Sequence, residues 1–309
     1  MKRSHPIDYS RAKTRREVLI RQRRGIWTPE QIESLARHFR IKPGMRLLDA
    51  GCGFGYAMRA WGRYCMPRGE LVGLDRDRKL LAQAARFCSK EGLGKAARFV
   101  AGDIGKMPFD GDVFDVALAH VVFCHLAEPE KALDEMIRVT RPGGCVAVFD
   151  NALGNGMAGG WSSWYAPSLK ELLSDYEVTI RMRNGRRKQG HGDFAVGCYV
   201  PGWMEARGME NVGVRMNERV NWIAPPYRSP EQRTAWQNER ERLKERARWD
   251  RIGKTEIEQM CAGGLTRTRF EQSRQKARVR LRARRRAMRE RTAAHAGSSP
   301  FWCIWGFKP

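Results

Sequence analysis

Three aspartates each follow an apolar run, and the first of them stands directly before a glycine-rich segment. Asp49 precedes GCGFG (51–55), Asp75 lies 24 residues beyond Gly51, and Asp103 closes a third apolar run. Glycine lets a backbone turn sharply and approach a ligand with no Cβ in the way. Carboxylates accept hydrogen bonds from amines and hydroxyls. These residue types therefore predict a binding site for a small ligand that carries amino and hydroxyl groups.

The glycine spacing restricts the kind of ligand. A dinucleotide-binding loop has the pattern G-x-G-x-x-G, and its third small residue would fall here at Tyr56. An acid at the loop entrance, Asp49, suits a positively charged group better than a pyrophosphate. Asp75 can accept both hydrogens of a ribose diol, and Asp103 can accept from an exocyclic amine while Ile104 packs against a flat base. An amine, a ribose, a base and a cationic centre together describe S-adenosylmethionine, whereas a plain tight turn would leave the three acids unexplained.

Apolar runs that alternate with helical stretches must position these residues. Over residues 41–150 the apolar runs predict five strands with helices between them, and the strands are 45–50, 70–77, 97–104, 114–122 and 145–150. This alternation predicts a doubly wound, Rossmann-like α/β fold with a mostly parallel sheet. In such a sheet ligands bind outside the carboxyl ends of the strands, which is where Asp49, Asp75 and Asp103 are expected.

The rest of the chain predicts additions to this core. Thr28 is expected to cap a helix, with Pro29 at its first position and Gln31 completing a capping box. Residues 210–223 and 301–307 are expected to add two strands at the sheet edge, the C-terminal one antiparallel. The predicted organisation is an N-terminal segment of basic helices or a lid (1–43), a cofactor-binding core (44–152), a substrate-side insertion with a helix and the sixth strand (153–227), a charged helical insertion (228–300) and a last core strand (301–309).

Residues from about 40 to 150 resemble the class I S-adenosylmethionine-dependent methyltransferases, and among them the small-molecule branch. The motifs that carry the resemblance are LLDAGCGFG (47–55), VGLDRD (72–77), AGDI (101–104), FDVALAHVVFCHL (114–126) and EMIRVTRPGG (135–144). The pattern GCYVPGWMEARGMENV (197–212) is similar to the helix and sixth strand of that branch. The resemblance weakens after residue 150, where acceptor specificity is set.

The resemblance implies a role for nine residues in binding S-adenosylmethionine. They are Gly51, Gly53 and Gly55 around the methionine moiety, Asp49 at its amino end, Asp75 and Arg76 at the ribose, Asp103 and Ile104 at the adenine, and His120 beneath the cofactor. It implies no universal catalytic residue, because methyl transfer from a sulfonium is an in-line displacement that depends mainly on alignment.

Further side chains are candidates for contact with the acceptor. His125 in FCHL is the candidate general base and His191 is a second candidate, because histidine titrates near neutral pH; a structural histidine is the alternative. The candidate substrate residues are Trp161, Trp164 and Tyr165 as an aromatic wall and Arg181, Arg183 and His191 near an acceptor's phosphate or carboxylate. The alternatives are aromatic side chains that pack onto the sheet and arginines on a solvated face.

The net charge of +24 belongs to the flanks of the chain. Residues 1–24 hold nine basic against two acidic residues and residues 240–291 hold nineteen against seven, whereas residues 41–150 hold sixteen against fourteen. The flanks favour an anionic partner, which is RNA, an anionic membrane surface or an anionic substrate, and solvated helix faces are the alternative. Residues 274–291 predict a helix with a thin apolar stripe ringed by arginine, which can dock on lipid or RNA or cover the active site; the stripe is Ala277, Leu281 and Met288.

These features predict an S-adenosylmethionine-dependent methyltransferase with a small-molecule acceptor and no metal. An RNA methyltransferase is the runner-up, but AHVVF (119–123) lacks the N/D-P-P-Y/F pattern that clamps a flipped amine. A non-catalytic cofactor-binding protein is the third alternative. No run approaches the ~18 apolar residues that a membrane helix needs. The eight cysteines are scattered singly, as in reduced proteins, so a cytoplasmic protein is expected, and a homo-oligomer stays open.

Overall fold

The computed structural model describes residues 27–151, 161–217, 220–244, 253–298 and 300–309. The chain divides into two compact units. Unit 1 comprises Met1–Leu153, Gly192–Glu218 and Pro300–Pro309, and unit 2 comprises Gly154–His191 and Arg219–Ser299. The part of the predicted N-terminal segment that precedes Trp27 lies outside the described residues.

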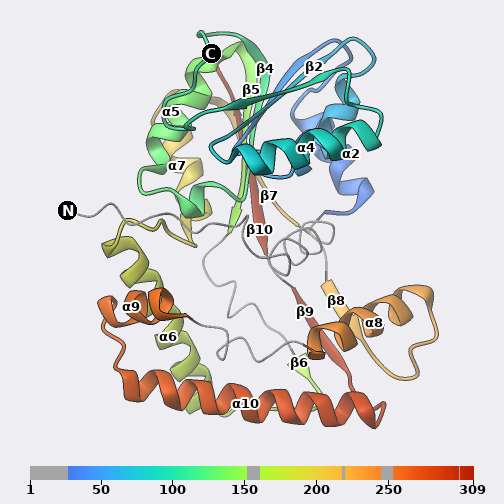
Figure 1. Cartoon of the computed structure of the whole chain (residues 1–309), viewed down its shortest axis with the longest axis vertical. Helices are drawn as coiled ribbons and strands as arrows, with labels where there is room; N and C mark the ends of the chain where they lie inside the picture. Colours follow the sequence, from blue (N-terminus) through green and yellow to red (C-terminus); the bar gives the residue numbers. More distant parts are fainter. Residues whose placement is uncertain (1–26, 152–160, 218–219, 245–252, 299) are drawn as a thin grey trace. The chain divides into compact units, whose positions relative to one another are not determined.

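Unit 1 is built on a seven-stranded sheet with the order β3-β2-β1-β4-β5-β10-β7 (Figure 1). The strands are β1 (Arg46–Ala50), β2 (Glu70–Asp75), β3 (Ala97–Ala101), β4 (Phe114–His120), β5 (Thr140–Asn151), β7 (Glu210–Met216) and β10 (Phe301–Phe307). The first five pair in parallel, and β10 runs antiparallel to both β5 and β7. The predicted Rossmann-like, mostly parallel sheet with an antiparallel C-terminal strand is confirmed. That strand lies one place inside the edge, and β7 forms the edge itself.

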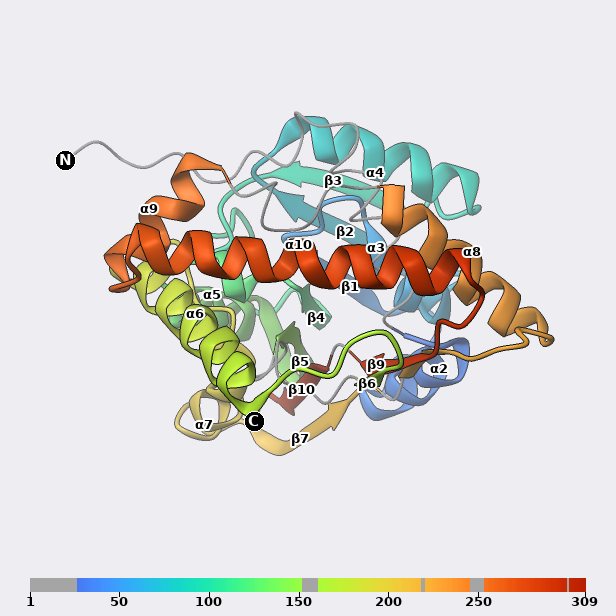
Figure 2. The ribbon, with the colours of Figure 1, turned by 90° about the horizontal axis from the view of Figure 1, so that it is seen from below.

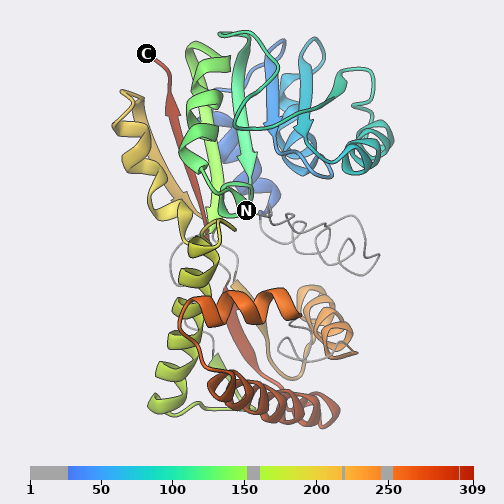
Figure 3. The ribbon, with the colours of Figure 1, turned by 60° about the vertical axis from the view of Figure 1, so that its left-hand side comes forward.

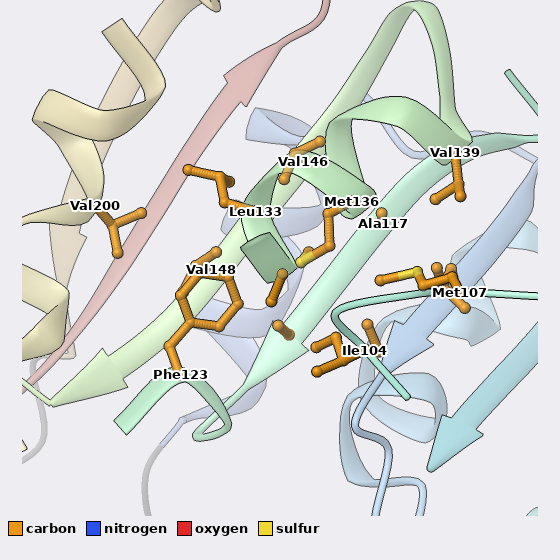
Figure 4. Packing of buried hydrophobic residues seen from close by; sticks show 14 of the residues in the cluster. Ile104, Met107, Ala117, Phe123, Leu133, Met136, Val139, Val146, Val148 and Val200 are labelled. Atoms are coloured by element: carbon orange, nitrogen blue, oxygen red, sulfur yellow. The ribbon is translucent and has the colours of Figure 1, made fainter. Parts of the chain in front are cut away.

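Helices cover both faces of this sheet because side chains along each strand alternate between two cores. Leu47 packs in one buried cluster and Leu48 in the other, and Val116 and Ala117 divide in the same way. The first cluster lies under α2 (Pro29–His38), α3 (Tyr56–Trp61) and α4 (Arg78–Lys90), and the second under α5 (Pro129–Val139) and α7 (Val200–Glu205). Figure 4 shows the second cluster, in which α5 side chains pack on β4 and β5. This period of two is the physical basis of the strand pattern in the sequence.

The predicted capping box of α2 is confirmed. The Thr28 hydroxyl accepts a hydrogen bond from the Gln31 backbone N–H at 3.2 Å, and the Gln31 side-chain oxygen accepts one from the Thr28 backbone N–H at 3.1 Å. Both bonds satisfy backbone donors that a helix leaves without partners at its first turn. The helix therefore begins at Pro29, directly after its cap Thr28, and the buried Trp27 precedes that cap.

Unit 2 contains a small antiparallel sheet with the order β6-β9-β8, formed by β6 (Trp161–Ser162), β9 (His295–Ser298) and β8 (Val220–Ile223). The expectation of one strand over residues 210–223 was wrong, because this segment forms β7 in unit 1 and β8 in unit 2. The first strand ends where its partner β10 begins: the Asn217 N–H donates to the Phe301 carbonyl, and its side chain accepts from the Phe301 N–H. Strand periodicity continues across this point, so the sequence pattern could not show the change of partner.

In its described residues unit 2 also contains the helices α6 (Leu169–Lys188), α8 (Pro230–Lys244), α9 (Lys254–Ala262) and α10 (Arg267–Arg289). Helices α6 and α9 cross closely (Figure 3). A Cβ on Gly185 would lie 1.5 Å from the Gln259 carbonyl oxygen, and a Cβ on Gly263 would lie 1.7 Å from the Arg181 carbonyl oxygen. Only glycine at these two positions permits the backbones to approach this far.

The long helix α10 contacts α6 from its first turn to its middle and contacts α8 near its C-terminal end (Figure 2). Its arginines pair with acids on those helices: Arg280 with Asp175 and Arg284 with Glu239. Met288, on the apolar stripe predicted to dock or to cover a site, is buried in the core of unit 2. Met288 and several of the arginines therefore serve internal packing.

Candidate functional site

The glycine-rich loop begins at the carboxyl end of β1. The backbone N–H groups of Gly51 and Cys52 both donate to the Leu74 carbonyl, at 2.7 and 2.9 Å, so the loop crosses the end of β2. Gly51 has a φ of +73°, and a Cβ there would lie 2.7 Å from a Val122 methyl carbon. Gly53 and Gly55 also have positive φ angles. Glycine is therefore needed in this loop for its backbone conformation and for its close approach to the segment after β4.

Asp49 joins this loop to the helix behind it. Its side chain is buried, and its Oδ2 accepts a hydrogen bond from the Met58 backbone N–H at 3.0 Å. Met58 lies in the first turn of α3, where unpaired N–H groups and the helix dipole favour a negative charge. One role of Asp49 is thus to hold α3 against the end of β1, in addition to the role at an amino group that the sequence predicts.

Asp75 stands at the end of β2 and is half-buried. Its Oδ2 accepts a hydrogen bond from the Gly53 backbone N–H at 2.8 Å, and its Oδ1 accepts one from the Asp77 backbone N–H at 2.9 Å. The carboxylate is therefore held in one orientation by the glycine-rich loop. Each of its oxygens has a second lone pair that can accept a further hydrogen bond, which is the requirement for gripping a diol. Arg76, the next residue, is exposed.

Asp103 and Ile104 follow β3 and separate into an exposed and a buried side chain. The Asp103 Oδ1 accepts a hydrogen bond from the Gly105 backbone N–H at 2.7 Å, which fixes the turn. Ile104 packs in the second core cluster, where Figure 4 shows it. The exposed carboxylate beside an apolar side chain is the arrangement that the sequence predicts for a base with an exocyclic amine.

His120 ends β4 inside a cage of aromatic rings. Its side chain is buried, and the Trp27 indole N–H donates to its Nε2 at 3.0 Å. The rings of Tyr56 and Phe149 lie with centroids 5.1 and 5.4 Å from the imidazole. Because Nε2 is an acceptor here, the bonded tautomer carries its hydrogen on Nδ1. Trp27 is not among the residues predicted from the sequence, although an apolar residue directly before a helix cap is the position of a hydrophobic staple.

The segment after β4 carries backbone strain. Val121 has a φ of +58°, which is unusual for a β-branched residue, and its N–H donates to the Phe149 carbonyl at 2.7 Å. Such a conformation costs on the order of 1 to 3 kcal/mol and is typical of functional sites. The short 3₁₀ turn η2 (Phe123–His125) follows, and the half-buried His125 ring lies edge-on to Phe194, with centroids 6.0 Å apart.

Asp150, at the end of β5, is a fourth strand-end acid that the sequence analysis missed. Its Oδ2 accepts a hydrogen bond from the Cys124 N–H at 3.0 Å, and its Oδ1 accepts one from the Asn151 N–H at 2.7 Å. The side chain is fully buried, and this burial raises the pKa of Asp150 to about 6. The signal was present in CVAVFD (145–150), an apolar run that ends in a carboxylate like the other three. Through Cys124, Asp150 fixes the turn that carries His125.

The residues predicted to contact the acceptor lie in unit 2, apart from His125. Trp164 is half-buried, with the Arg284 guanidinium 5.5 Å from its ring centre, and the Tyr165 hydroxyl donates to Glu171. Arg181 donates to Glu177 at 2.9 Å and to the Gly264 carbonyl at 2.7 Å. Trp164, Tyr165 and Arg181 therefore take part in the packing of unit 2 itself.

Three further candidates for the acceptor also lie in unit 2. Trp161 opens strand β6, and Arg183 lies half-buried in the C-terminal half of α6. His191 follows α6, and burial together with the nearby Arg186 lowers its pKa, so the neutral imidazole is favoured. A neutral imidazole near pH 7 can accept a proton, which is the property that the sequence analysis required of a second candidate base.

In the part of the chain that the structure describes, unit 1 is left and re-entered beyond the carboxyl ends of its parallel strands. The chain leaves after Asn151, at the carboxyl end of β5, and after Asn217, beyond the carboxyl end of β7; it returns at Phe301, which pairs with Asn151. It also returns at Gly192, where a Cβ would lie 2.4 Å from the Cys124 carbonyl oxygen, beyond the end of β4. All four junctions thus lie on the side of the sheet where the carboxyl ends of the parallel strands carry Asp49, Asp75 and Asp103.

Among the described residues, no group of three or more histidine, cysteine, aspartate or glutamate side chains is arranged to hold a metal ion. The part of the chain that the structure describes also contains no helix of the length and apolar character needed to cross a membrane. All eight cysteines are free thiols, and six are buried. Burial raises the pKa of Cys65 and of Cys88 to about 12. Both thiols therefore stay protonated and pack as small apolar side chains.

Residues 48–148 match the protein family described as methyltransferase domain. Cycloartenol-C-24-methyltransferase 1 of rice (Oryza sativa subsp. japonica) is 31% identical over 132 residues, which cover 40% of this chain and 38% of that protein. A sterol 24-C-methyltransferase of Gibberella zeae is 35% identical over 116 residues, which cover 38% of this chain and 30% of that protein. The similarity therefore spans less than half the length of these relatives.

A solved structure supports the fold across most of the chain. A candidate methyltransferase from Bacillus halodurans superposes with a TM-score of 0.50, covering 91% of this chain and 99% of its own, at 14% sequence identity. At this identity the likeness concerns the fold alone. The segment that matches the family, residues 48–148, runs from β1 to β5 and contains all nine predicted cofactor residues.

Proposed function

Residues 48–148 form a class I S-adenosylmethionine-dependent methyltransferase domain, and we propose that the chain uses it to transfer a methyl group to a small-molecule acceptor. The observation that carries this proposal is the carboxylate of Asp75, which the N–H groups of Gly53 and Asp77 hold at the end of β2. Both oxygens keep the capacity to accept from a ribose diol, and the glycine loop beside them leaves the backbone open to a ligand.

The residues present fit the cofactor. In our proposal Gly51, Gly53 and Gly55 lie along its methionine moiety, Asp49 faces its amino group, and Asp75 with Arg76 takes the ribose. Asp103 and Ile104 take the adenine, and the buried His120 lies beneath it. When bound, S-adenosylmethionine supplies a methyl group already activated by a sulfonium. The protein then has to align the acceptor and exclude water, and alignment of this kind can supply about 7 to 11 kcal/mol of a barrier.

We assign proton removal from the acceptor, where it is needed, to His125. This side chain follows the strained Val121 and lies in the η2 turn, whose Cys124 N–H is bonded to the buried Asp150. A histidine with a pKa near neutrality is suited to a general base. The turn is held from two sides, which supports a role for His125 that requires a defined position.

We propose that unit 2 selects the acceptor. The path of the chain supports this proposal, because each junction with unit 1 lies on the side of the sheet where the carboxyl ends of the strands carry the proposed cofactor residues. The names of the relatives, cycloartenol and sterol methyltransferases, favour a small organic acceptor over a macromolecule. An acceptor with a phosphate or carboxylate would find cationic partners on α6 at Arg183, and His191 is the second candidate base.

Calorimetric titration with S-adenosylhomocysteine tests the cofactor site. Wild-type protein is expected to bind, Asp75→Ala to lose at least about tenfold in affinity because two hydrogen bonds to a ribose diol are lost, and the exposed Asp110→Ala to bind like wild type. Equal affinity in Asp75→Ala and wild type would contradict the assignment of the ribose to Asp75. Absence of binding in all three proteins would contradict the proposed function as a whole.

Methyl transfer itself is tested with S-adenosylmethionine labelled on the methyl group and nuclease-treated protein. Label is expected to appear in a small organic molecule from a panel of sterols and of phosphorylated or carboxylated compounds. In a parallel reaction to which RNA is added, labelling of that RNA that weakens with added salt would establish the runner-up function of an RNA methyltransferase. Cofactor binding without turnover on any acceptor would favour a non-catalytic binding protein.

A further inference from the structure

The first two turns of α6 expose an apolar stripe. Leu169, Leu172, Leu173 and Tyr176 are 71%, 42%, 59% and 39% exposed. Their spacing of three, four and seven residues places them on one side of the helix. Exposed leucines are common singly, but a contiguous apolar group on one helix face marks an interaction site.

This stripe is separate from the face by which α6 packs in its own unit. Ser174 and Val178 are buried, and Val178 joins Met260, Leu265 and Phe270 in a core cluster with α9 and α10. The helix begins at a capping box in which the Ser168 hydroxyl accepts from the Glu171 N–H, so its first turn is well defined. The exposed leucines therefore lie on a different side of α6 from the face that packs in unit 2.

The same side of α6 becomes cationic toward its C-terminal end. In steps of three or four residues from Tyr176 it continues through Ile180 and Arg183 to Arg187, and Lys170 flanks the leucines. Unit 2 as a whole holds 28 lysines and arginines against 12 aspartates and glutamates, a net charge of +16. The apolar stripe is thus set in a strongly positive unit.

We propose that this face of α6 docks on an anionic lipid surface. Leucine and tyrosine side chains would enter the boundary between headgroups and acyl chains, and the arginines and lysine would meet lipid phosphates. Charge selects this partner: a second copy would bring +16 against +16, and a nucleic acid offers no apolar phase for three leucines. The inference rests on α6 and the charge of unit 2, and of the residues in the proposed function it shares Arg183 alone.

Co-sedimentation with lipid vesicles tests the proposal on the full chain. Wild-type protein is expected to bind phosphatidylcholine vesicles that contain phosphatidylserine and to bind pure phosphatidylcholine vesicles far more weakly. The variant Leu169→Ser/Leu173→Ser is expected to lose about tenfold or more in vesicle partitioning, since two exposed leucines no longer enter the lipid. Val279→Ser, which changes an exposed aliphatic side chain on α10 of the same unit, is expected to bind like wild type.

Three results would overturn the proposal. They are failure of the wild type to bind anionic vesicles, equal binding by the double-leucine variant and wild type, and equal losses in that variant and Val279→Ser. Sedimentation velocity tests the alternative that a second copy of the chain covers this face. A wild-type dimer that dissociates in the double-leucine variant, together with no vesicle binding by wild type, would make this face an interface between copies. Because both leucines are exposed, circular dichroism of the variant is expected to match wild type, which keeps a folding defect distinguishable.

Discussion

Asp150 places a carboxyl group in the core of unit 1 directly behind the turn that carries His125. Its two oxygens accept from the backbone of Cys124 and Asn151, and those bonds favour the ionised form. Burial has the larger effect and raises the pKa to about 6. The folded protein therefore binds a proton at this group at a pH where the unfolded chain does not.

This difference predicts the pH dependence of stability at residue scale. An exposed aspartate has a pKa of about 3.9. As pH falls from about 7 to about 4, protonation of native Asp150 should add roughly 2 to 3 kcal/mol to the unfolding free energy of wild type. Asp150→Asn lacks this contribution. The unfolding free energy of wild type minus that of the variant should therefore increase as pH falls. Urea unfolding of both proteins across this range measures it, and parallel pH curves would refute the prediction.

Residue types and spacing predicted where three of the candidate cofactor residues lie in the fold. Asp49, Asp75 and Asp103 all lie at strand ends. This was predictable because an apolar run indicates a buried strand and the acid after it indicates where that strand ends. The hydrogen-bond partners of the candidate site residues could not be predicted from the sequence pattern. Trp27 reaches His120 over 93 positions in the chain, and nothing local relates the two. The predicted acceptor contacts of Trp164, Tyr165 and Arg181 stay predictions, since each also packs within unit 2.

At the scale of elements, the crossing of α6 and α9 depends on glycine. Gly185→Ala should destabilise unit 2 by ~3 kcal/mol or more, because its Cβ would overlap the Gln259 carbonyl and the helices would have to separate. Gly202→Ala on α7 is the matched variant: its Cβ would meet nothing within 4 Å, so a gain of ~0.5 to 1 kcal/mol is expected. Hydrogen exchange of α6 and α9 measures the first effect, and unchanged protection in Gly185→Ala would contradict it.

At the scale of the whole molecule, the charge is divided unequally between the units. Unit 1 holds 30 basic and 22 acidic residues, a net +8, whereas unit 2 carries the remaining +16 on fewer residues. Salt screens repulsion among the exposed cations of unit 2, and it also weakens ion pairs such as Arg269 with Glu177. Repulsion is the larger effect, because basic residues outnumber acidic ones by more than two to one.

Added sodium chloride should therefore stabilise unit 2 more than unit 1. Raising its concentration to about 0.5 M shortens the screening length to a few ångströms. We expect the unfolding midpoint of unit 2 to rise more than that of unit 1, as followed by temperature-dependent hydrogen exchange of segments from each unit. Equal shifts in both units, or a lower midpoint for unit 2, would show that its ion pairs outweigh the repulsion.

The sequence by itself determined the Rossmann-like sheet from β1 to β5, the glycine loop and the acids at the strand ends, since these are local: each depends on side-chain periodicity of two or on a backbone conformation that only glycine adopts readily. Tertiary structure alone decided which segments share a unit. It ended β7 at Met216, placed β10 inside the edge, joined α6 to α9 through two glycines and turned several α10 arginines toward acids. The reason is that pairing between distant segments depends on the shape and charge of both partners, and a pattern along one segment describes only one of them.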